Sequence, residues 1–486
     1  MEISRSLQIL KTNIVRWYSF KDNSNILVVG KDTVELCNFL NEKYNVKSID
    51  ADVTYINNTK FDYIIIKDNI NYLENFKENL AEDGTILLLI NNRWGVTYLA
   101  GGDGFETLYG NKNNLLNKEQ IEEKINEVGF NNYKFFYPLP NYEFANTIFS
   151  DDYLPKSTDS KIVNNNIYLN DNYLLFNEIE LLKSFTKNGE FTKFTNSYLI
   201  EINPKSTEKA IFYGNCRKEE YKVITRIYEN QVEKVPYSKK SLAHINHIKN
   251  NIDDLKAHGF DLLDRIEDGK LISKYVTLPN MYETTVNKIK NCELEKAIEI
   301  IDKIYNDIKE RFIEDKVDTI NQEYFNGLDA SEFLVVKKAY IDLVFENMFF
   351  DNKAMYIYDQ EWVIENCPLE FILFRLINNM YLMNSEISEI ISRNDMLKRF
   401  GLIYYFDEFL KAETIFQNKV LNQEIIAIYD RANELSISKE EIINAKENSY
   451  MIGLYKAENI KKEKYILELQ QKIEELNNRI YKESEN

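Results

Sequence analysis

Short apolar runs alternate with amphipathic segments along the first part of the chain. NILVVG (25–30), FDYIIIKD (61–68) and TILLLINN (85–92) are almost continuously apolar and have the length of strands. This is typical of strands buried on both faces of a parallel sheet. TVELCNFLNEKY (33–44) and NKEQIEEKINEVGF (117–130) repeat apolar residues at helical spacing. Strands that alternate with helices predict an α/β fold with a parallel sheet.

Three further segments belong to this region. NVKSID (45–50) predicts a second strand that ends at an aspartate. YLENFKENLAEDG (72–84) predicts a helix that Gly84 closes. Residues 3–20 have near-helical spacing and predict a lead-in helix.

A different pattern begins near residue 191. SYLIEI (197–202), AIFYG (210–214) and YKVITRIYENQVEKVPY (221–237) are β-rich, and long helical segments follow. A small β-rich lobe that precedes a helical lobe is an α+β arrangement. The predicted division is a first domain over 1–155, a linker over 156–190, a second domain over 191–450 with lobes of about 191–275 and 276–450, and a C-terminal helix over 451–486.

The last segment carries an apolar seam. Its members follow 3-4 spacing over about two heptads, namely Ile466, Leu469, Ile473, Leu476 and Ile480. Two interpretations stay open. The segment is either one amphipathic helix docked on its own domain or a short coiled coil that joins this chain to another copy or to a partner.

Charge and composition exclude several classes of function. The net charge is −18, from 60 basic and 78 acidic residues, and no basic stripe is present, so nucleic acid is not an expected partner. No apolar run approaches the roughly 20 residues of a membrane-spanning helix, and MEISRSLQIL lacks the regions of a signal peptide. The four cysteines are far apart without metal-ligand spacing. We therefore expect reduced thiols, a cytoplasmic location and no membrane insertion.

The first domain resembles the class I S-adenosylmethionine-dependent methyltransferases. Gly30 ends the first predicted strand, and Asp50 ends the second, 20 positions later. In that family the loop after the first strand binds the methionine part of the cofactor, and an acidic residue at the second strand holds the ribose hydroxyls, as in dinucleotide folds. The resemblance implies a Rossmann-like domain that binds S-adenosylmethionine through Gly30 and Asp50.

The chain departs from that family at two places. Lys31, Asp32, Thr33 and Val34 stand where the family has further glycines. An inward Asp32 carboxylate 4 Å from the cofactor's own carboxylate would cost about 4 kcal/mol at an effective dielectric of about 20. The stretch 51–60 is too short for the helix and strand that the family has there. Two interpretations follow: a shortened, degenerate domain that no longer binds the cofactor, or a working methyltransferase with an atypical loop.

The second domain carries a different motif set. AYIDLVFENMFF (339–350) holds Asp342 and Asn347 at D-x-x-x-x-N spacing, and YIYDQEW then supplies Asp359 and Glu361. This set resembles small-molecule kinases of the aminoglycoside- and choline-kinase type. The resemblance implies a bilobal kinase-like domain that binds ATP with Mg²⁺. Asp342 would be the catalytic base, Asn347 and Asp359 the metal ligands, and Glu361 a support.

Upstream, Lys234 in the predicted hairpin is the candidate for contact with the α and β phosphates. Other parts of the motif set are missing. Gly214 stands alone where a glycine-rich loop is expected, and the helix after Lys234 offers His244 and His247 in place of a glutamate. An active phosphotransferase, an inert nucleotide-binding domain and a chance pattern all stay open.

The chain as a whole resembles bacterial proteins that fuse these two domains among surface-glycan systems. NNRWGVTYLAGG (91–102), YPLPNYEFANTIFSDDYLP (137–155) and YIYDQEW (356–362) carry this likeness. It implies a two-domain transferase that acts on a glycan or small-molecule acceptor. The alternatives are an active methyltransferase and a non-catalytic scaffold that assembles with an active partner through the C-terminal helix.

Overall fold

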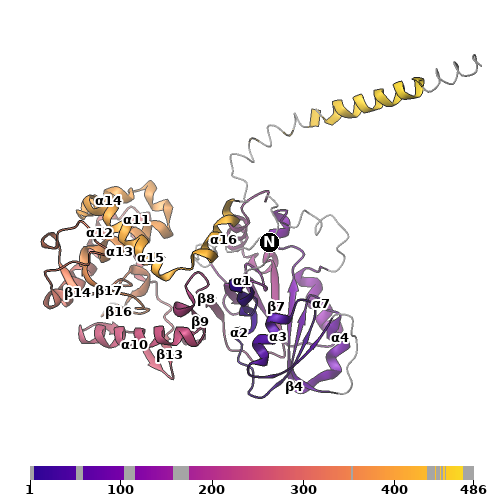
Figure 1. Ribbon diagram of the computed structural model, residues 1–486, viewed down its shortest axis with the longest axis horizontal. Helices are drawn as coiled ribbons and strands as arrows, with labels where there is room; N and C mark the ends of the chain where they lie inside the picture. Colours follow the sequence, from indigo (N-terminus) through magenta and orange to yellow (C-terminus); the bar gives the residue numbers. More distant parts are fainter. Residues whose placement is uncertain are drawn as a thin grey trace, which may run out of the picture.

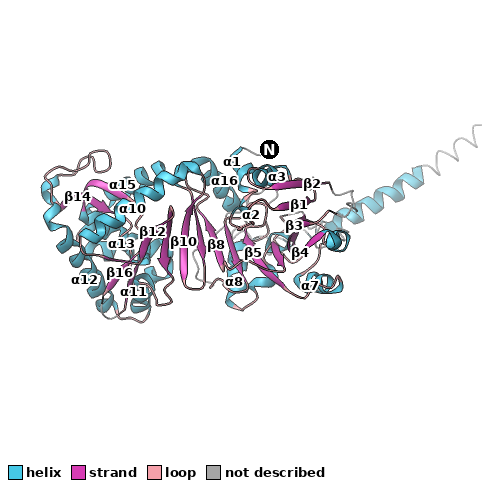
Figure 2. Cartoon of the chain, turned by 90° about the horizontal axis from the view of Figure 1, so that it is seen from below, coloured by secondary structure: helices cyan, strands magenta, loops and turns pink. Residues whose placement is uncertain are grey.

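The computed structural model describes residues 5–50, 59–102, 115–156, 174–351, 354–434, 444, 449, 453–454 and 456–473. The described strands include a twelve-stranded sheet in the order β12-β13-β10-β9-β8-β6-β5-β7-β4-β3-β1-β2. Figure 2 shows this sheet running through much of the molecule. Its four strands at one end, here called the parallel half, form the parallel sheet that the sequence predicts, and the other eight strands are antiparallel.

The parallel half is built from four strands that pair in parallel. Their bounds are β1 Asn25–Val29, β2 Asn45–Ile49, β3 Phe61–Lys67 and β4 Leu80–Asn91. Alternate residues of β1 face opposite sides: Leu27 and Val29 belong to one core and Ile26 and Val28 to the other. Both faces of the sheet are therefore buried, which explains the continuous apolar runs.

Helices cover both faces of this half. The first face is covered by α2 (Asn13–Arg16) and α3 (Val34–Asn41), whose apolar residues share a core with Ile26. The second face is covered by α4 (Tyr72–Phe76), α7 (Lys118–Glu127) and α8 (Glu178–Lys187). Further short helices are α1 Arg5–Leu10, α5 Val96–Leu99 and α9 Phe191–Phe194. This is a doubly wound, Rossmann-like sheet.

The predicted helix over 72–84 is wrong. The helix α4 ends at Phe76, and β4 already begins at Leu80. The pairing of β3 with β4 has a bulge between Phe61 and Tyr63, and Gly84 lies within β4, where a Cβ would meet the Leu80 side chain at 2.6 Å. Gly84 therefore permits close approach inside a bulged strand instead of closing a helix. The lead-in helix over 3–20 is likewise replaced by the separate helices α1 and α2.

The strand order continues across the boundary predicted at residue 191. The strand β7 (Ser197–Ile202) lies antiparallel between β4 and β5 (Tyr133–Leu139), and β6 (Thr147–Ser150) pairs with β5. The sheet then extends through β8 (Ala210–Tyr213), which pairs with β6. The two predicted domains thus share one sheet among the described residues.

The far end of the sheet, called the antiparallel half below, follows β8. Its strands are β9 Val223–Ile227, β10 Gln231–Pro236, β12 Asp264–Glu267 and β13 Lys270–Lys274. The helix α10 (Leu242–Ala257) packs on these strands, and its Ile245 and Ile248 share a core with Val223 and Leu271.

The remaining elements form a helical body with its own core. Its helices are α11 Met281–Lys290, α12 Leu294–Phe312, α13 Leu369–Met383, α14 Arg393–Arg399 and α15 Phe406–Val420. Two small sheets lie within it, one of β14 Val335–Tyr340 with β17 Val363–Pro368, and one of β11 Asp261–Leu262, β16 Met355–Ile357 and β15 Met348–Phe350.

After the helical body, the chain packs against its own N-terminal helix. The helix α16 (Gln423–Glu434) places Ile425 and Tyr429 in a core with Leu7 and Leu10 of α1, and Figure 1 shows the two helices side by side. Further on, residues 456–473 are helical. Within the described part of the chain, no helix has both the length and the apolar character needed to cross a bilayer.

Candidate functional site

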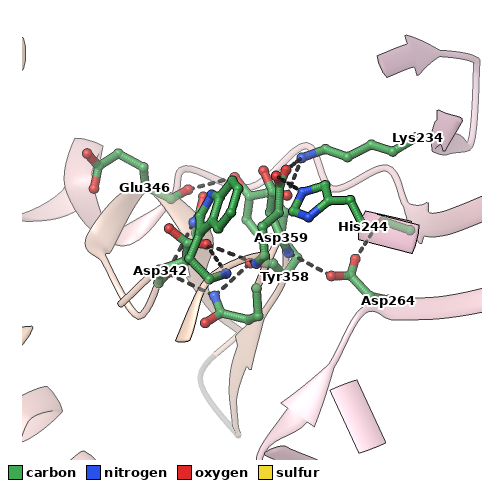
Figure 3. Close-up of polar contacts among 12 residues, drawn as sticks. Lys234, His244, Asp264, Asp342, Glu346, Tyr358 and Asp359 are labelled. Atoms are coloured by element: carbon green, nitrogen blue, oxygen red, sulfur yellow. Dashed lines mark hydrogen bonds and ion pairs between the residues drawn. The ribbon is translucent and has the colours of Figure 1, made fainter. Parts of the chain in front are cut away.

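The kinase-motif residues meet where the antiparallel half of the sheet faces the helical body. Lys234 lies on β10, Asp342 follows β14, and Asn347 ends a 3-10 turn before β15. Asp359 comes two residues after β16. Figure 3 shows Lys234, Asp342 and Asp359 converging from different elements. The structure therefore brings together residues that are far apart in sequence.

The ammonium of Lys234 contacts two carboxylates. Its Nζ donates to Asp359 and, at 2.6 Å, to Oε1 of Glu361. The side chain of Lys234 is 13% exposed and that of Asp359 is 28% exposed. Burial alone would lower the pKa of Lys234, but Asp359 and Glu361 raise it. The lysine is therefore held in its charged form.

Glu361 is almost fully enclosed, with a side chain that is 2% exposed. Its Oε2 accepts from Nη1 of Arg217 at 2.5 Å and from Nε2 of His244 at 3.0 Å. Burial would raise its pKa, but Arg217, Lys234 and then His244 hold that pKa well below the usual value. Glu361 is therefore ionised, and charge-assisted hydrogen bonds surround it.

Asp342 is fixed by the backbone of the second motif. Its Oδ2 accepts the N–H of Glu361 at 2.9 Å and the N–H of Trp362 at 3.0 Å. Burial raises the pKa of Asp342 to about 7, with Arg375 acting against the rise and Glu361 adding to it. This carboxyl therefore titrates near neutral pH, as a general base does.

Two side-chain amides hold the loop that follows Asp342. Asn347 donates from Nδ2 to the carbonyl of Asp342 at 3.1 Å, and Gln360 donates from Nε2 to the same carbonyl at 2.8 Å. With Nδ2 used in this way, the Oδ1 atom is the oxygen that Asn347 offers to a cation.

Asp264 was missed by sequence reasoning. It lies on β12, is buried, and accepts the backbone N–H of Asp359 at 2.6 Å and the hydroxyl of Ser273. Asp359 has a φ of 60°, in the left-handed region that aspartate tolerates better than most residues. Burial raises the pKa of Asp264 to about 6. No motif distinguishes Asp264 from Asp261 and Asp268 in the sequence.

The predicted metal ligands fit Mg²⁺ better than a transition metal. Within the described residues, no three or more histidine, cysteine, aspartate or glutamate side chains are arranged to hold a metal ion. Mg²⁺ commonly uses one or two carboxylates together with substrate phosphates and water instead of a protein cage. Asp359 and Asn347 offer a carboxylate and an amide oxygen, which suits that mode.

The methyltransferase-type residues lie at the carboxyl ends of the parallel strands. The Gly30 N–H donates to the carbonyl of Ile49 at 3.2 Å, so Gly30 lies beside the end of β2, where the exposed Asp50 follows. Gly30 has a φ of 139°, and a Cβ there would meet the Cβ of Lys67 at 2.9 Å. The backbone conformation and the packing of Gly30 thus both require glycine, whether or not a cofactor binds.

Charged side chains fill the edge between β1 and β3, where the strand order reverses and ligands bind in such sheets. Lys67 is 7% exposed, and its Nζ lies 3.0 Å from Oε1 of Glu143 and donates to the carbonyl of Asp32 at 3.4 Å. Nearby, the Tyr142 hydroxyl donates to Asp68. The carboxylate of Asp32 belongs to an exposed residue, and the stretch 51–58 lies outside the described residues. An ion pair of the protein itself, Lys67 with Glu143, therefore lies at this edge.

Comparisons with known proteins found only distant likenesses. No protein-family profile matches the sequence, and no curated protein matches it either. Among solved structures, a SAM-dependent methyltransferase from Thermotoga maritima, described as a possible histamine N-methyltransferase, is 14% identical. The match covers 28% of this chain and 76% of that one, with a TM-score of 0.22.

Two further solved structures are similar to parts of the chain. A SAM-dependent methyltransferase from Archaeoglobus fulgidus is 12% identical over 40% of this chain and 93% of its own, with a TM-score of 0.25. The aminoglycoside phosphotransferase in a streptomycin–ATP–APH(2″)-IIa ternary complex is 13% identical over 43% of this chain and 90% of its own, with a TM-score of 0.22. All three TM-scores are low, so the side chains of the site carry the functional proposal.

Proposed function

We propose that the chain is a two-domain transferase whose site at Lys234, Asp342 and Asp359 binds Mg-ATP and transfers a phosphoryl group to a hydroxyl acceptor. The observation that carries this proposal is the cluster itself. A lysine, a carboxyl whose pKa burial raises to about 7 and a second carboxylate come from three separate elements to one place. These are the groups that phosphoryl transfer requires.

Each residue has a role that follows from its contacts. Asp342, tied through Oδ2 to the backbone of Glu361 and Trp362, accepts the proton of the acceptor hydroxyl. Asp359 and Asn347 would hold Mg²⁺, which neutralises phosphate charge when bound. Lys234 lies against Asp359 and would contact the phosphates beside the metal.

The acceptor that we propose is a hydroxyl of a cell-surface glycan or its precursor. This rests on the likeness of three sequence stretches to bacterial proteins of surface-glycan systems. A net charge of −18 makes an uncharged or cationic acceptor more compatible with the chain than a polyanion.

A ligand screen by thermal denaturation tests the proposal. Mg-ATP, ATP without metal, S-adenosylmethionine and its demethylated product are each added at millimolar concentration to the purified full chain. We expect Mg-ATP to raise the melting temperature, since a ligand at 100 times its Kd stabilises the folded state by about 2.7 kcal/mol. No shift with Mg-ATP would contradict the proposal.

A second candidate is methyl transfer with an atypical loop. One observation favours it: the backbone of Gly30 meets the end of β2, next to Asp50, at the switch point of the sheet. The ion pair of Lys67 with Glu143 at the same edge opposes it. In the same screen, this candidate requires a shift with S-adenosylmethionine that Asp50→Ala removes. A non-catalytic scaffold would respond to neither cofactor.

A further inference from the structure

Glu361 contacts basic side chains from three elements that lie apart in sequence. Lys234 comes from β10, His244 from α10, and Arg217 from the loop between β8 and β9. Glu361 itself follows β16 in the helical body. One buried carboxylate therefore joins the antiparallel half of the sheet to the helical body.

The helix α10 offers no carboxylate to Lys234 among its described contacts. In protein kinases, a glutamate on the helix after the lysine strand forms an ion pair that holds the lysine in place. The acidic residues of α10 are engaged elsewhere: Asp253 pairs with Lys249, and Asp254 pairs with Lys338 and Tyr340. At the point where α10 faces the site, it presents His244.

We propose that Glu361 is the positioning residue for Lys234 and replaces the missing helix glutamate, with His244 and Arg217 as its anchors. This inference rests on the proposed function. The two carboxylate oxygens of Glu361 have different partners. Oε2 is held by Arg217 at 2.5 Å and His244 at 3.0 Å, and Oε1 is thereby aimed at Lys234 at 2.6 Å.

The backbone of Glu361 is fixed as firmly as its side chain. Its N–H donates to Asp342 at 2.9 Å, and its carbonyl accepts from Nδ2 of Asn251 on α10 at 3.1 Å. Asn251 is buried and Asp342 is half-buried, so these hydrogen bonds are largely shielded from water. The carboxylate therefore has little freedom to take another orientation.

A functional consequence follows from the origin of Glu361. Lys234 is oriented by the helical body, so its position depends on contact between that body and the antiparallel strands. A shift of α10 would withdraw His244 and Asn251 from Glu361, while the pair of Lys234 with Glu361 itself joins β10 to the helical body. A separation of the two parts would break it.

A double-mutant cycle on ATP affinity tests this role. The variants are Lys234→Ala, Glu361→Gln and the two combined, and calorimetry measures ATP binding with and without magnesium. We expect Glu361→Gln to weaken binding by about 30-fold, the effect of removing one partner from a buried charge pair. The loss should occur with and without metal, and Glu361→Gln should add nothing once Lys234 is alanine.

The controls separate positioning from other roles. Glu219→Gln removes an exposed ion pair of the same type, with Lys240 at 2.6 Å, and should bind ATP like the wild type. His244→Glu combined with Glu361→Gln returns a carboxylate to the helix side and should recover most of the lost affinity. Recovery of ATP binding in this variant would also show that the fold tolerates the loss of Glu361.

Two results would overturn the inference: additive effects of Lys234→Ala and Glu361→Gln, or a loss confined to the magnesium arm, which would make Glu361 a metal ligand instead. A wild-type chain that binds no ATP would overturn the proposed function itself.

Discussion

The side chain of Asp342 holds the backbone of the second motif and is also the base that we propose for phosphoryl transfer. Its Oδ2 is occupied by two backbone N–H groups, while no described residue donates a hydrogen bond to its other carboxylate oxygen. Burial raises its pKa to about 7. A carboxylate that is fixed through one oxygen keeps the other to take a proton from a positioned hydroxyl.

Replacement of the Asp342 carboxyl by an amide should separate phosphoryl transfer from ATP binding. Asp342→Asn keeps an oxygen for the two backbone donors but removes the base, so we expect phosphoryl transfer to fall by about 100-fold or more while ATP affinity changes little. Turnover of radiolabelled ATP and calorimetry on the same protein measure the two quantities. A variant that transfers at the wild-type rate would show that Asp342 is not the base.

At the residue scale, the sequence predicted the local motifs and missed the contacts that hold them. Asp342, Asn347 and Asp359 stand in short, ordered spacings, and the chain order then singles out Lys234. Arg217 and Asp264 have no such signal. Arg217 reaches Glu361 across 144 positions, and only the folded chain brings them together.

At the element scale, the helix α10 is held to the helical body at its C-terminal end. His258, just beyond α10, faces the carbonyl of Asp254 with Nδ1 and Asp315 with Nε2, both at 2.8 Å. Its own carbonyl accepts from Arg311 at 3.4 Å. Both ring nitrogens face acceptors, so both hydrogen bonds need the protonated ring.

This arrangement predicts a pH-dependent contribution to stability. Burial would lower the pKa of His258, but the Asp254 carbonyl and Asp315 raise it above the usual value. Because the folded pKa is raised, the contribution is fully present below the unfolded pKa of about 6.5 and is lost as the pH rises through the folded pKa. His258→Gln should therefore destabilise the chain more at about pH 6 than at about pH 9.

Urea unfolding of the wild type and His258→Gln at the two pH values measures this difference. Asp315→Asn serves as the matched control and should reduce the same pH dependence. An equal destabilisation by His258→Gln at both pH values would contradict the protonated contact.

Elements were predicted best where periodicity is strong and local. The buried strands β1, β3 and β4 follow from their apolar runs. The prediction of a helix over 72–84 was wrong because the residues from Leu80 onward pair with β3 as a strand. This pairing overrides the helical pattern of the local sequence. The sequence around residues 72–84 does not show that β3 will pair with this segment.

At the scale of the whole molecule, the sequence suggested two separate domains joined by a linker. In the structure, β7 instead lies between β4 and β5, and the same sheet continues through β6 into β8. The helix α16 also returns to pack on α1. Both the strand order and the packing of α16 on α1 depend on contacts between segments that are distant in sequence. Changes in composition along the chain do not predict such contacts.

The C-terminal seam remains a prediction at this scale. Residues 456–473 are helical, and Ile466, Leu469 and Ile473 are all exposed, while Leu476 and Ile480 lie outside the described residues. If the seam joins two copies, removal of residues 457–486 should halve the mass measured by light scattering. An unchanged mass would rule out assembly through this segment.

The most direct test of the central claim is isothermal titration calorimetry of the full chain with Mg-ATP. We predict saturable binding in the wild type that Asp359→Ala abolishes, because this change removes both the carboxylate that we propose to hold Mg²⁺ and a partner of Lys234. Absence of binding heat at millimolar ATP in the wild type, or the same Kd in the wild type and in Asp359→Ala, would contradict it.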